Sequence, residues 1–238
     1  MELILDTHCH SISSGHAYST IQEMAQSAKD KGLHLIALTD HAPSMPGAGH
    51  LYHFLNLKVI PRTINNIEIL RGAETNIMDY GGRIDLPEEV LQRLDIVIAS
   101  LHEPCIEPGT VEENTNALIG AMSNPYVDII GHSGNPKYPI DIDKVVLTAK
   151  EKNVLLEINN SSFQVRLGSK DNCTAIAQKA KEIGCRLVVG SDAHISYDIG
   201  KFDTVLEIFR QIDMPEDLIM NTSVDKLKNY LREKGKHI

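Results

Sequence analysis

Seven short apolar segments, separated by helical sequence, constrain the fold of this chain most strongly. Most are rich in Ile, Val and Leu and show little alternation, a pattern typical of parallel strands buried on both faces. Repeated strand–helix units predict right-handed crossovers and a parallel sheet, and therefore an α/β fold. The expected strands are Leu3–His8, Leu33–Thr39, Ile67–Glu74, Ile96–Leu101, Val127–Gly131, Val154–Ile158 and Leu187–Ser191.

The segments between these strands carry signals for helix ends. A capping box begins at Thr20, and Gly32 ends the helix that it starts. Pro87 followed by two acids suits a first helical turn, where the missing N–H costs little and negative charge favours the dipole. Asp171 is expected to cap a helix that runs to Gly184. Two more helices are expected after the last strand, over residues 204–211 and 224–234.

Seven strand–helix units can form either an open doubly wound sheet or a barrel. The chain has no G-x-G-x-x-G or Walker pattern after its first strand, so it lacks the phosphate loop of the common open folds. We therefore favour a closed or nearly closed seven-stranded barrel, formed by a single domain that spans residues 1–238. Residues 42–66 are expected to form a long loop over the barrel mouth, with at most a short helix.

Charge and cysteine content limit the partners and the compartment. The net charge of -9 repels polyanions, which makes nucleic acid a poor candidate for the main partner. The four cysteines form no C-x-x-C pair, and the segment MELILDTHCH has no basic region or cleavage site of a signal peptide. No stretch approaches the roughly 20 apolar residues of a membrane span. We expect a cytoplasmic protein with reduced thiols and no membrane partner.

Histidines concentrate where the expected strands end. Six of the 11 histidines lie there: His8, His10, His41, His102, His132 and His194. In a parallel barrel, functional residues gather at the carboxyl ends of the strands, so we expect these six to lie close together. His8 and His10 are two residues apart on an extended strand, so both project to one side while Cys9 points away. Two neutral imidazoles on one face are natural ligands for zinc, manganese or iron.

Three further side chains complete a candidate metal centre, namely His16 in the first loop and Glu74 and Asp192 at strand ends. These nine ligands exceed the needs of one ion and suit two or three ions that share a bridging carboxylate. Asp6 and Asp40 precede candidate ligands and could either orient imidazoles or bond to the backbone.

The motifs D-T-H-C-H, T-D-H, G-A-E, S-L-H, G-H-S and G-S-D-A-H, together with His16, resemble the PHP (polymerase and histidinol phosphatase) family. Length and motif order are most similar to its stand-alone trinuclear-zinc phosphatase branch. The resemblance runs from Leu3 to about Asn221 and implies a distorted seven-stranded barrel that binds three divalent ions, with zinc expected and manganese or iron as alternatives. It assigns three ligand groups: first His8, His10, Glu74 and Asp192; second Glu74, His102 and His132; third His16, His41 and His194. It also allows an association such as a trimer.

Three divalent ions outweigh two carboxylates, so the centre should attract a small dianion such as a phosphate monoester. We therefore expect a hydrolase, a phosphomonoesterase in which a metal-bound hydroxide attacks phosphorus. Asp192, His194 and His102 are the catalytic candidates, and Arg166 could either clamp the phosphate or remain solvated. A histidinol-phosphate phosphatase, a metal-dependent amidohydrolase, a nuclease and a metal-binding regulator without turnover remain alternatives. No lysine at a strand end supports the amidohydrolase, and no basic or aromatic patch supports the nuclease.

Overall fold

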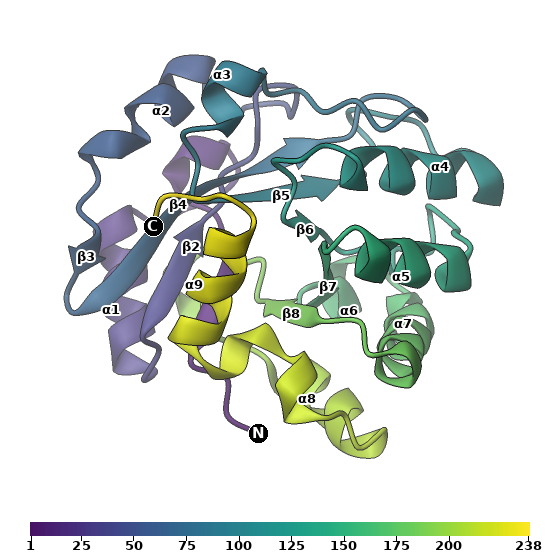
Figure 1. Cartoon of the computed structure of the whole chain (residues 1–238). Coiled ribbons are helices and arrows are strands. Elements are labelled where there is room, and N and C mark those ends of the chain that lie inside the picture. Colours follow the sequence, from purple (N-terminus) through teal and green to yellow (C-terminus); the bar gives the residue numbers. More distant parts are fainter.

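Seven parallel strands form the inner layer of the computed structural model, which describes residues 1–238 (Figure 1). They follow one another around the sheet in chain order and are β1 (Leu5–Cys9), β2 (Leu35–Leu38), β4 (Ile67–Asn76), β5 (Ile96–Ser100), β6 (Ile129–Ile130), β7 (Leu155–Asn159) and β8 (Leu187–Gly190). Each coincides with one of the seven apolar segments of the sequence. The prediction of a seven-stranded α/β barrel is therefore confirmed, and the open doubly wound alternative is wrong.

The first and last strands approach each other and nearly close the barrel. Beyond the strand ends, the amide of His10 donates to the carbonyl of Ala193 at 2.9 Å, and the amide of Asp192 donates to the carbonyl of His8 at 2.9 Å. Lower down, the buried side chain of Asn221 fills the seam. Its Nδ2 donates to carbonyls of β1 and β8 at 2.9 and 2.8 Å, and its Oδ1 accepts from an amide of β8 at 2.7 Å. An amide side chain thus substitutes there for the missing strand–strand bonds.

A C-terminal helix, α9 (Val224–Glu233), closes the amino-terminal end of the barrel. Its Leu227, Tyr230 and Leu231 are buried and pack with the lower inward-facing residues of the strands, among them Leu5 and Ile96. The Tyr230 hydroxyl donates to two backbone carbonyls at that end, at 2.8 and 3.0 Å. The barrel interior is therefore apolar at this end, and polar chemistry is confined to the opposite end.

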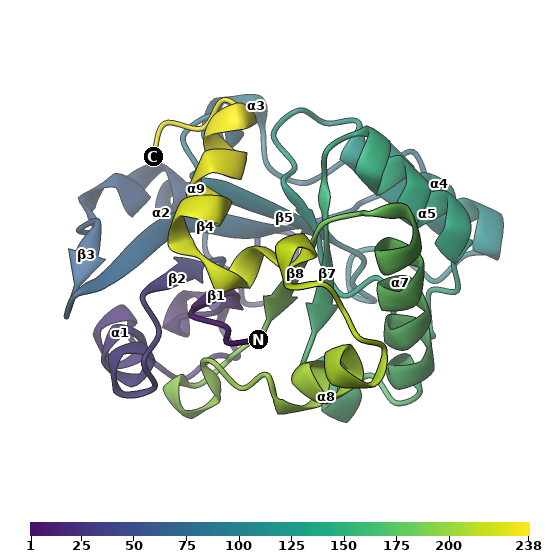
Figure 2. The same cartoon turned by 60° about the horizontal axis from the view of Figure 1, so that its bottom comes forward.

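The remaining helices are mostly amphipathic and cover the outside of the strands (Figures 1 and 2). They are α1 (Ile21–Asp30), α3 (Glu88–Leu91), α4 (Val111–Met122), α5 (Ile142–Glu151), α7 (Ser169–Ile183) and α8 (Asp203–Gln211). The short α6 (Ser162–Val165) instead follows β7 at the carboxyl end of the barrel and contacts α7. The capping box at Thr20 is present, and Gly184 ends α7 in the left-handed conformation, both as predicted. The predicted cap at Asp171 is wrong, because α7 begins two residues earlier after Gly168 and Asp171 lies within its first turn.

Residues 42–66 are more structured than predicted and do not all lie over the barrel mouth. They contain the short helix α2 (Leu51–Asn56), a 3-10 helix (Leu57–Val59) and an eighth, two-residue strand, β3 (Thr63–Ile64). Thr63 pairs antiparallel with Glu68 near the beginning of β4, at the opposite end of the barrel from Glu74. The segment thus returns the chain from one end of the barrel to the other, and only its first part lies near the mouth.

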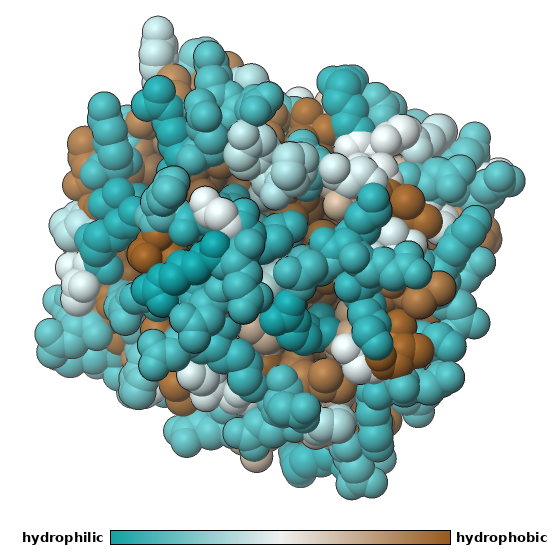
Figure 3. Space-filling model, viewed as in Figure 1, coloured by the Kyte–Doolittle hydropathy of each residue, from teal (hydrophilic) through white to brown (hydrophobic).

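The surface around α8 and α9 is mostly hydrophilic, and its hydrophobic residues are in small separate areas (Figure 3). None of the helices combines the length and the apolar character that are needed to cross a membrane. All four cysteines are unpaired.

Candidate metal centre

The Glu74 carboxylate lies at the middle of a buried cluster of histidines at the carboxyl end of the barrel. Five imidazole nitrogens lie 2.8–3.5 Å from its oxygens, three at Oε2 (His8, His10 and His41) and two at Oε1 (His102 and His132). Glu74 is fully buried and sits on β4 with its neighbour His41 in a parallel bridge. One carboxylate therefore faces side chains that lie on or shortly after four other strands, β1, β2, β5 and β6.

Asp192 provides the second carboxylate of the cluster. Its Oδ1 lies 3.5 Å from His8 Nε2 and 3.2 Å from His10 Nε2. Its Oδ2 accepts hydrogen bonds from Arg166 at 3.3 Å and from Asn159 at 3.2 Å. Arg166 is thus placed beside the cluster, and its side chain is only 17% exposed.

His194 and His16 extend the cluster toward solvent. Their Nε2 atoms lie 3.0 Å apart, and the ring of His194 also stacks on that of His10, with centroids 4.3 Å apart. The ring of His41 lies 5.0 Å from that of His16. The structure therefore brings all nine side chains that the sequence suggested as ligands into one connected cluster.

The backbone is strained at two of these positions. His132 and Asp192 have positive φ angles of 28° and 55°, in a region that residues with side chains seldom adopt. Such conformations cost about 1–3 kcal/mol each and persist where the surrounding structure enforces them. Each residue lies two positions beyond the end of its strand, β6 or β8, and the turn directs its side chain toward the cluster.

The unpaired atoms of the cluster fit metal ions. Five buried atoms in the cluster have no hydrogen-bond partner, and all can act as ligands: His8 Nε2, His10 Nε2, His41 Nδ1, Glu74 Oε2 and His102 Nε2. Unpaired buried polar atoms are costly in a protein interior, so a cluster of them facing one another requires a compensating charge. Three triads have ligand atoms within 4.8 Å of one another: His10–His41–His194, His8–His10–Glu74 and His41–Glu74–His102. The overlap of these triads suits more than one ion.

A third acid, Glu157 on β7, lies beneath the cluster and was not predicted. Its Oε1 lies 2.7 Å from His8 Nδ1, and its Oε2 accepts from the amide of His132 at 2.8 Å and from Asn159 Nδ2 at 3.1 Å. A Cβ at Gly190 would overlap the Glu157 carboxylate, so glycine makes room for it. The signal in the sequence was a lone acid inside the otherwise apolar segment Val154–Ile158.

Besides Glu157, two uncharged side chains, those of Asn76 and Ser14, orient rings of candidate ligands. Asn76 Oδ1 lies 2.7 Å from His102 Nδ1, because β4 continues two residues beyond its predicted end and turns Asn76 to the same face as Glu74. Ser14 Oγ lies 3.2 Å from His10 Nδ1 and donates to Asp40 at 2.7 Å.

The two acids that precede ligands therefore differ. Asp40 is linked to His10 through Ser14 and contacts the half-buried His53 Nε2 at 3.2 Å. Asp6 instead accepts from backbone amides, those of His8 at 3.3 Å, Ser191 at 3.1 Å and Gly200 at 2.9 Å. The side chain of His53, which belongs to α2, is 21% exposed.

Electrostatics divide the cluster into neutral and charged groups. Burial, together with the neighbouring His41, lowers the pKa of His10 to about 3, and burial together with Arg166 lowers the pKa of His132 to about 4. Burial alone would lower the pKa of His8, but Glu157, Glu74 and Asp192 outweigh it and hold that pKa well above its usual value. The surrounding cationic groups likewise outweigh burial and hold the pKa of Glu74 and of Asp192 well below the usual range. The same field that favours a proton on His8 favours a metal cation.

Comparison with known proteins places this cluster in a family. The PHP domain matches residues 6–164, which contain seven of the nine clustered ligands. The chain belongs to the PHP family. Its PHP relatives include proteins named "probable phosphatase" from Thermoanaerobacter sp. (strain X514), Caldanaerobacter subterraneus subsp. tengcongensis and Acetivibrio thermocellus. They are 58%, 60% and 52% identical to it, over 100% of this chain and 98%, 94% and 99% of theirs.

Two solved structures share the fold of this PHP protein at low identity. One is a histidinol phosphate phosphatase from Lactococcus lactis, crystallised with zinc, L-histidinol and phosphate, at a TM-score of 0.59 and 18% identity. The similarity covers 98% of this chain and 94% of that one. The other is a putative 2-pyrone-4,6-dicarboxylic acid hydrolase from Pseudomonas putida, at a TM-score of 0.54, 17% identity and 98% coverage of both chains.

Proposed function

We propose that this protein is a phosphomonoesterase that uses divalent metal ions held by the nine clustered side chains. The observation that carries the proposal is the buried Glu74 carboxylate, which lies within 3.5 Å of five imidazole nitrogens while its own Oε2 has no hydrogen-bond partner. The full-length relatives named probable phosphatases support the same activity.

Three ions per chain suit this arrangement, with Glu74 shared between two of them. His8, His10, Glu74 and Asp192 would hold the first, Glu74, His102 and His132 the second, and His16, His41 and His194 the third. Imidazole and carboxylate ligands suit zinc, and manganese or iron would fit the same donors. When bound, such ions polarise a phosphate ester and activate water as a nucleophile at neutral pH.

Residues around the cluster orient its ligands and lie where they can contact a substrate. Glu157 and Asn76 accept the Nδ1–H of His8 and His102, which leaves the Nε2 lone pairs facing Glu74. Arg166, which contacts Asp192, would donate to a phosphate oxygen at the edge of the cluster. His194, whose side chain is 29% exposed, lies on the more open side of the cluster and 3.7 Å from the buried Asp192, so this pair can hold or move a proton during turnover.

The protein purified in the presence of zinc or manganese tests the proposal. Elemental analysis should give two to three ions per chain, and hydrolysis of a generic aryl phosphate should disappear on chelation and return on adding metal. The Glu74→Gln variant should lose its bound metal ions and also its activity. Glu68→Gln, a half-exposed acid on the same strand, is the matched control and should retain both.

Three outcomes would contradict the proposal in different ways. Bound metals without hydrolysis of any phosphate ester would favour a binding role without turnover. An active His102→Ala variant would show that the second ligand group is wrong. Degradation of DNA with no phosphomonoesterase activity would favour the nuclease alternative.

A further inference from the structure

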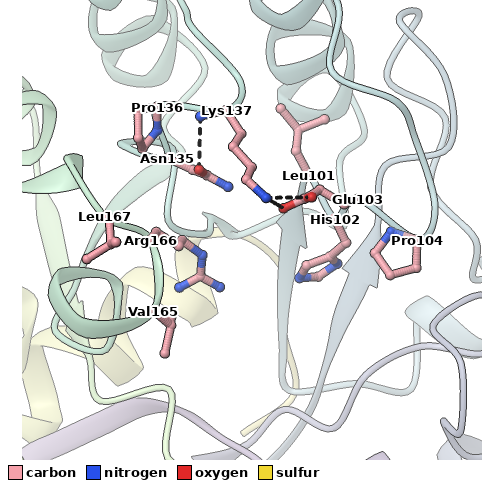
Figure 4. Close-up of a pocket in the computed structure, with 10 residues that line it drawn as sticks. All are labelled: Leu101, His102, Glu103, Pro104, Asn135, Pro136, Lys137, Val165, Arg166 and Leu167. Carbon is pink, nitrogen blue, oxygen red and sulfur yellow. Dashed lines mark hydrogen bonds and ion pairs between the residues drawn. The ribbon is translucent and has the colours of Figure 1, made fainter.

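A pocket of about 460 Å³ opens beside the metal centre (Figure 4). Three loops form it: 101–104 after β5, 135–137 after β6, and 165–167 at the end of α6. His102 and Arg166 line the pocket and also contact the centre, at Glu74 and Asp192 respectively. A phosphate bound at the centre would therefore have its leaving group at the entrance to this pocket.

The pocket carries an excess of positive charge in a protein whose net charge is -9. Its ionic side chains are Arg166, Lys137 and Glu103, which give one net positive charge. Lys137 Nζ lies 2.8 Å from Glu103 Oε2, and the two side chains are 62% and 49% exposed. Ion pairs this exposed contribute little stability, so Lys137 can exchange Glu103 for another anion at small cost.

The position of Lys137 is fixed relative to the centre by the backbone. The amide of Lys137 donates to Asn135 Oδ1 at 3.1 Å, and the amide of Asn135 donates to the carbonyl of His132 at 3.1 Å. The loop that carries this cation is therefore attached to one of the candidate ligands. Figure 4 shows the Lys137 ammonium and the Arg166 guanidinium on the same open space.

Apart from Asn135, the remaining walls of the pocket are apolar and suit a short carbon body. Pro104 and Pro136 line the pocket from two different loops. Val165 and Leu167 lie at its rim, where they are 66% and 83% exposed. Exposed aliphatic side chains next to a polar centre contribute to the free energy of binding when a ligand covers them and removes their surface from water.

We propose that this pocket selects phosphomonoesters whose leaving group carries a second anionic group, a carboxylate or another phosphate, bound by Lys137. The inference rests on the proposed phosphatase activity and adds the substrate class. Glu103 competes with that anion for Lys137, so the two partners of one ion pair have opposite effects on selectivity.

Three aryl substrates test the proposal on the metal-loaded protein: phenyl phosphate, para-carboxyphenyl phosphate and para-phenylene bisphosphate. The readout is the ratio of kcat/KM for each charged substrate to that for phenyl phosphate, so a general loss of activity cancels. Lys137→Met should lower the ratio about fivefold, the effect of one exposed charge pair. Glu103→Gln should raise the ratio. Lys228→Met, which breaks a similar ion pair with Glu68 at the other end of the barrel, should leave it unchanged.

The larger of the two charged-substrate ratios tells whether the second anion is a carboxylate or a phosphate, and either preference supports the proposal. Equal ratios in wild type and Lys137→Met would overturn it. A fall in the ratio in both Lys137→Met and Glu103→Gln would overturn it as well, because the pair would then act only as a structural link. Failure to hydrolyse even phenyl phosphate would overturn the phosphatase assignment itself, and this inference with it.

Discussion

Replacement of Glu157 by glutamine tests how the protein sets the protonation of its ligands. The two oxygens of Glu157 accept three hydrogen bonds, from His8 Nδ1 at 2.7 Å, from the amide of His132 at 2.8 Å and from Asn159 Nδ2 at 3.1 Å. Glutamine has the same shape, but one of its two positions is an NH₂ donor. Since all three partners donate, no orientation of the glutamine satisfies them.

The two orientations of glutamine fail in different ways. With its NH₂ toward His8, the ring must accept at Nδ1 and carry its proton on Nε2, the atom that faces Glu74 and Asp192 at 3.3 and 3.5 Å. A protonated Nε2 cannot bind a metal. With its NH₂ toward the amide of His132, that backbone donor is left buried and unpaired, at a cost of about 1–3 kcal/mol. The lost negative charge weakens cation binding in both cases.

We therefore expect Glu157→Gln to bind its metals about 10–100-fold more weakly, the usual cost of removing a hydrogen-bond partner of a ligand. Competition with a chromogenic chelator measures this directly, without reference to activity. Glu151→Gln, at an exposed position at the end of α5, is the matched control and should bind metal normally. Metal affinity within about twofold of wild type for Glu157→Gln would refute the reasoning, because the tautomer of His8 would then not depend on this acid.

Three further predictions concern stability and packing. Asn221→Ala should lower the free energy of unfolding, measured in urea, by about 3 kcal/mol, because it leaves buried backbone groups of β1 and β8 unpaired. The control Asn116→Ala, at an exposed position, should change it little. If both variants were equally stable, Asn221 would not hold β1 and β8 together. Gly190→Ala should abolish metal binding, measured by elemental analysis, because the added methyl group would overlap the Glu157 carboxylate. A full complement of metal in this variant would show that Glu157 does not need the space left by Gly190. In the metal-free protein His10 and His132 stay neutral while their unfolded counterparts bind protons below the ordinary pKa of 6.5. The folded state then binds fewer protons than the unfolded state. As the pH is lowered from about 6.5 to 5, the free energy of unfolding should therefore fall by up to about 1.4 kcal/mol per pH unit for each histidine. A free energy of unfolding in urea that does not change over this pH range would contradict the prediction.

The strands were predictable because burial on both faces leaves a strong compositional signal. Runs such as Ile96–Ser100 are almost wholly apolar, and their order along the chain fixes a parallel sheet once the crossovers are right-handed. The short strand β3 was missed because two residues carry no periodicity. The start of α7 was misplaced because an acid in the first turn and an acid at the cap give similar signals, and Gly168 supplies the turn instead.

The candidate ligands were predictable for a related reason. A histidine or acid at the end of an apolar strand stands out, and parallel strands bring their carboxyl ends to one edge. The supporting side chains did not stand out in this way. Glu157 and Asn76 are remote in the sequence from the rings that they contact, at 149 residues from His8 and 26 residues from His102. Ser14 lies only four residues from His10, but a lone serine carries no signal that marks it as a partner of a ligand. The pocket beside the centre depends on three loops whose mutual positions no local pattern specifies.

The sequence by itself therefore determined the order of the strands and which side chains meet at their ends. Both follow from burial and from the alternation of side chains along a strand, which are local properties. Only the tertiary structure decided how the barrel closes, through Asn221, and which ring nitrogens face the centre, through Glu157 and Asn76. Those features are hydrogen bonds between distant segments. Their geometry is set when the strands pack around one another, so the composition of any single strand does not contain it.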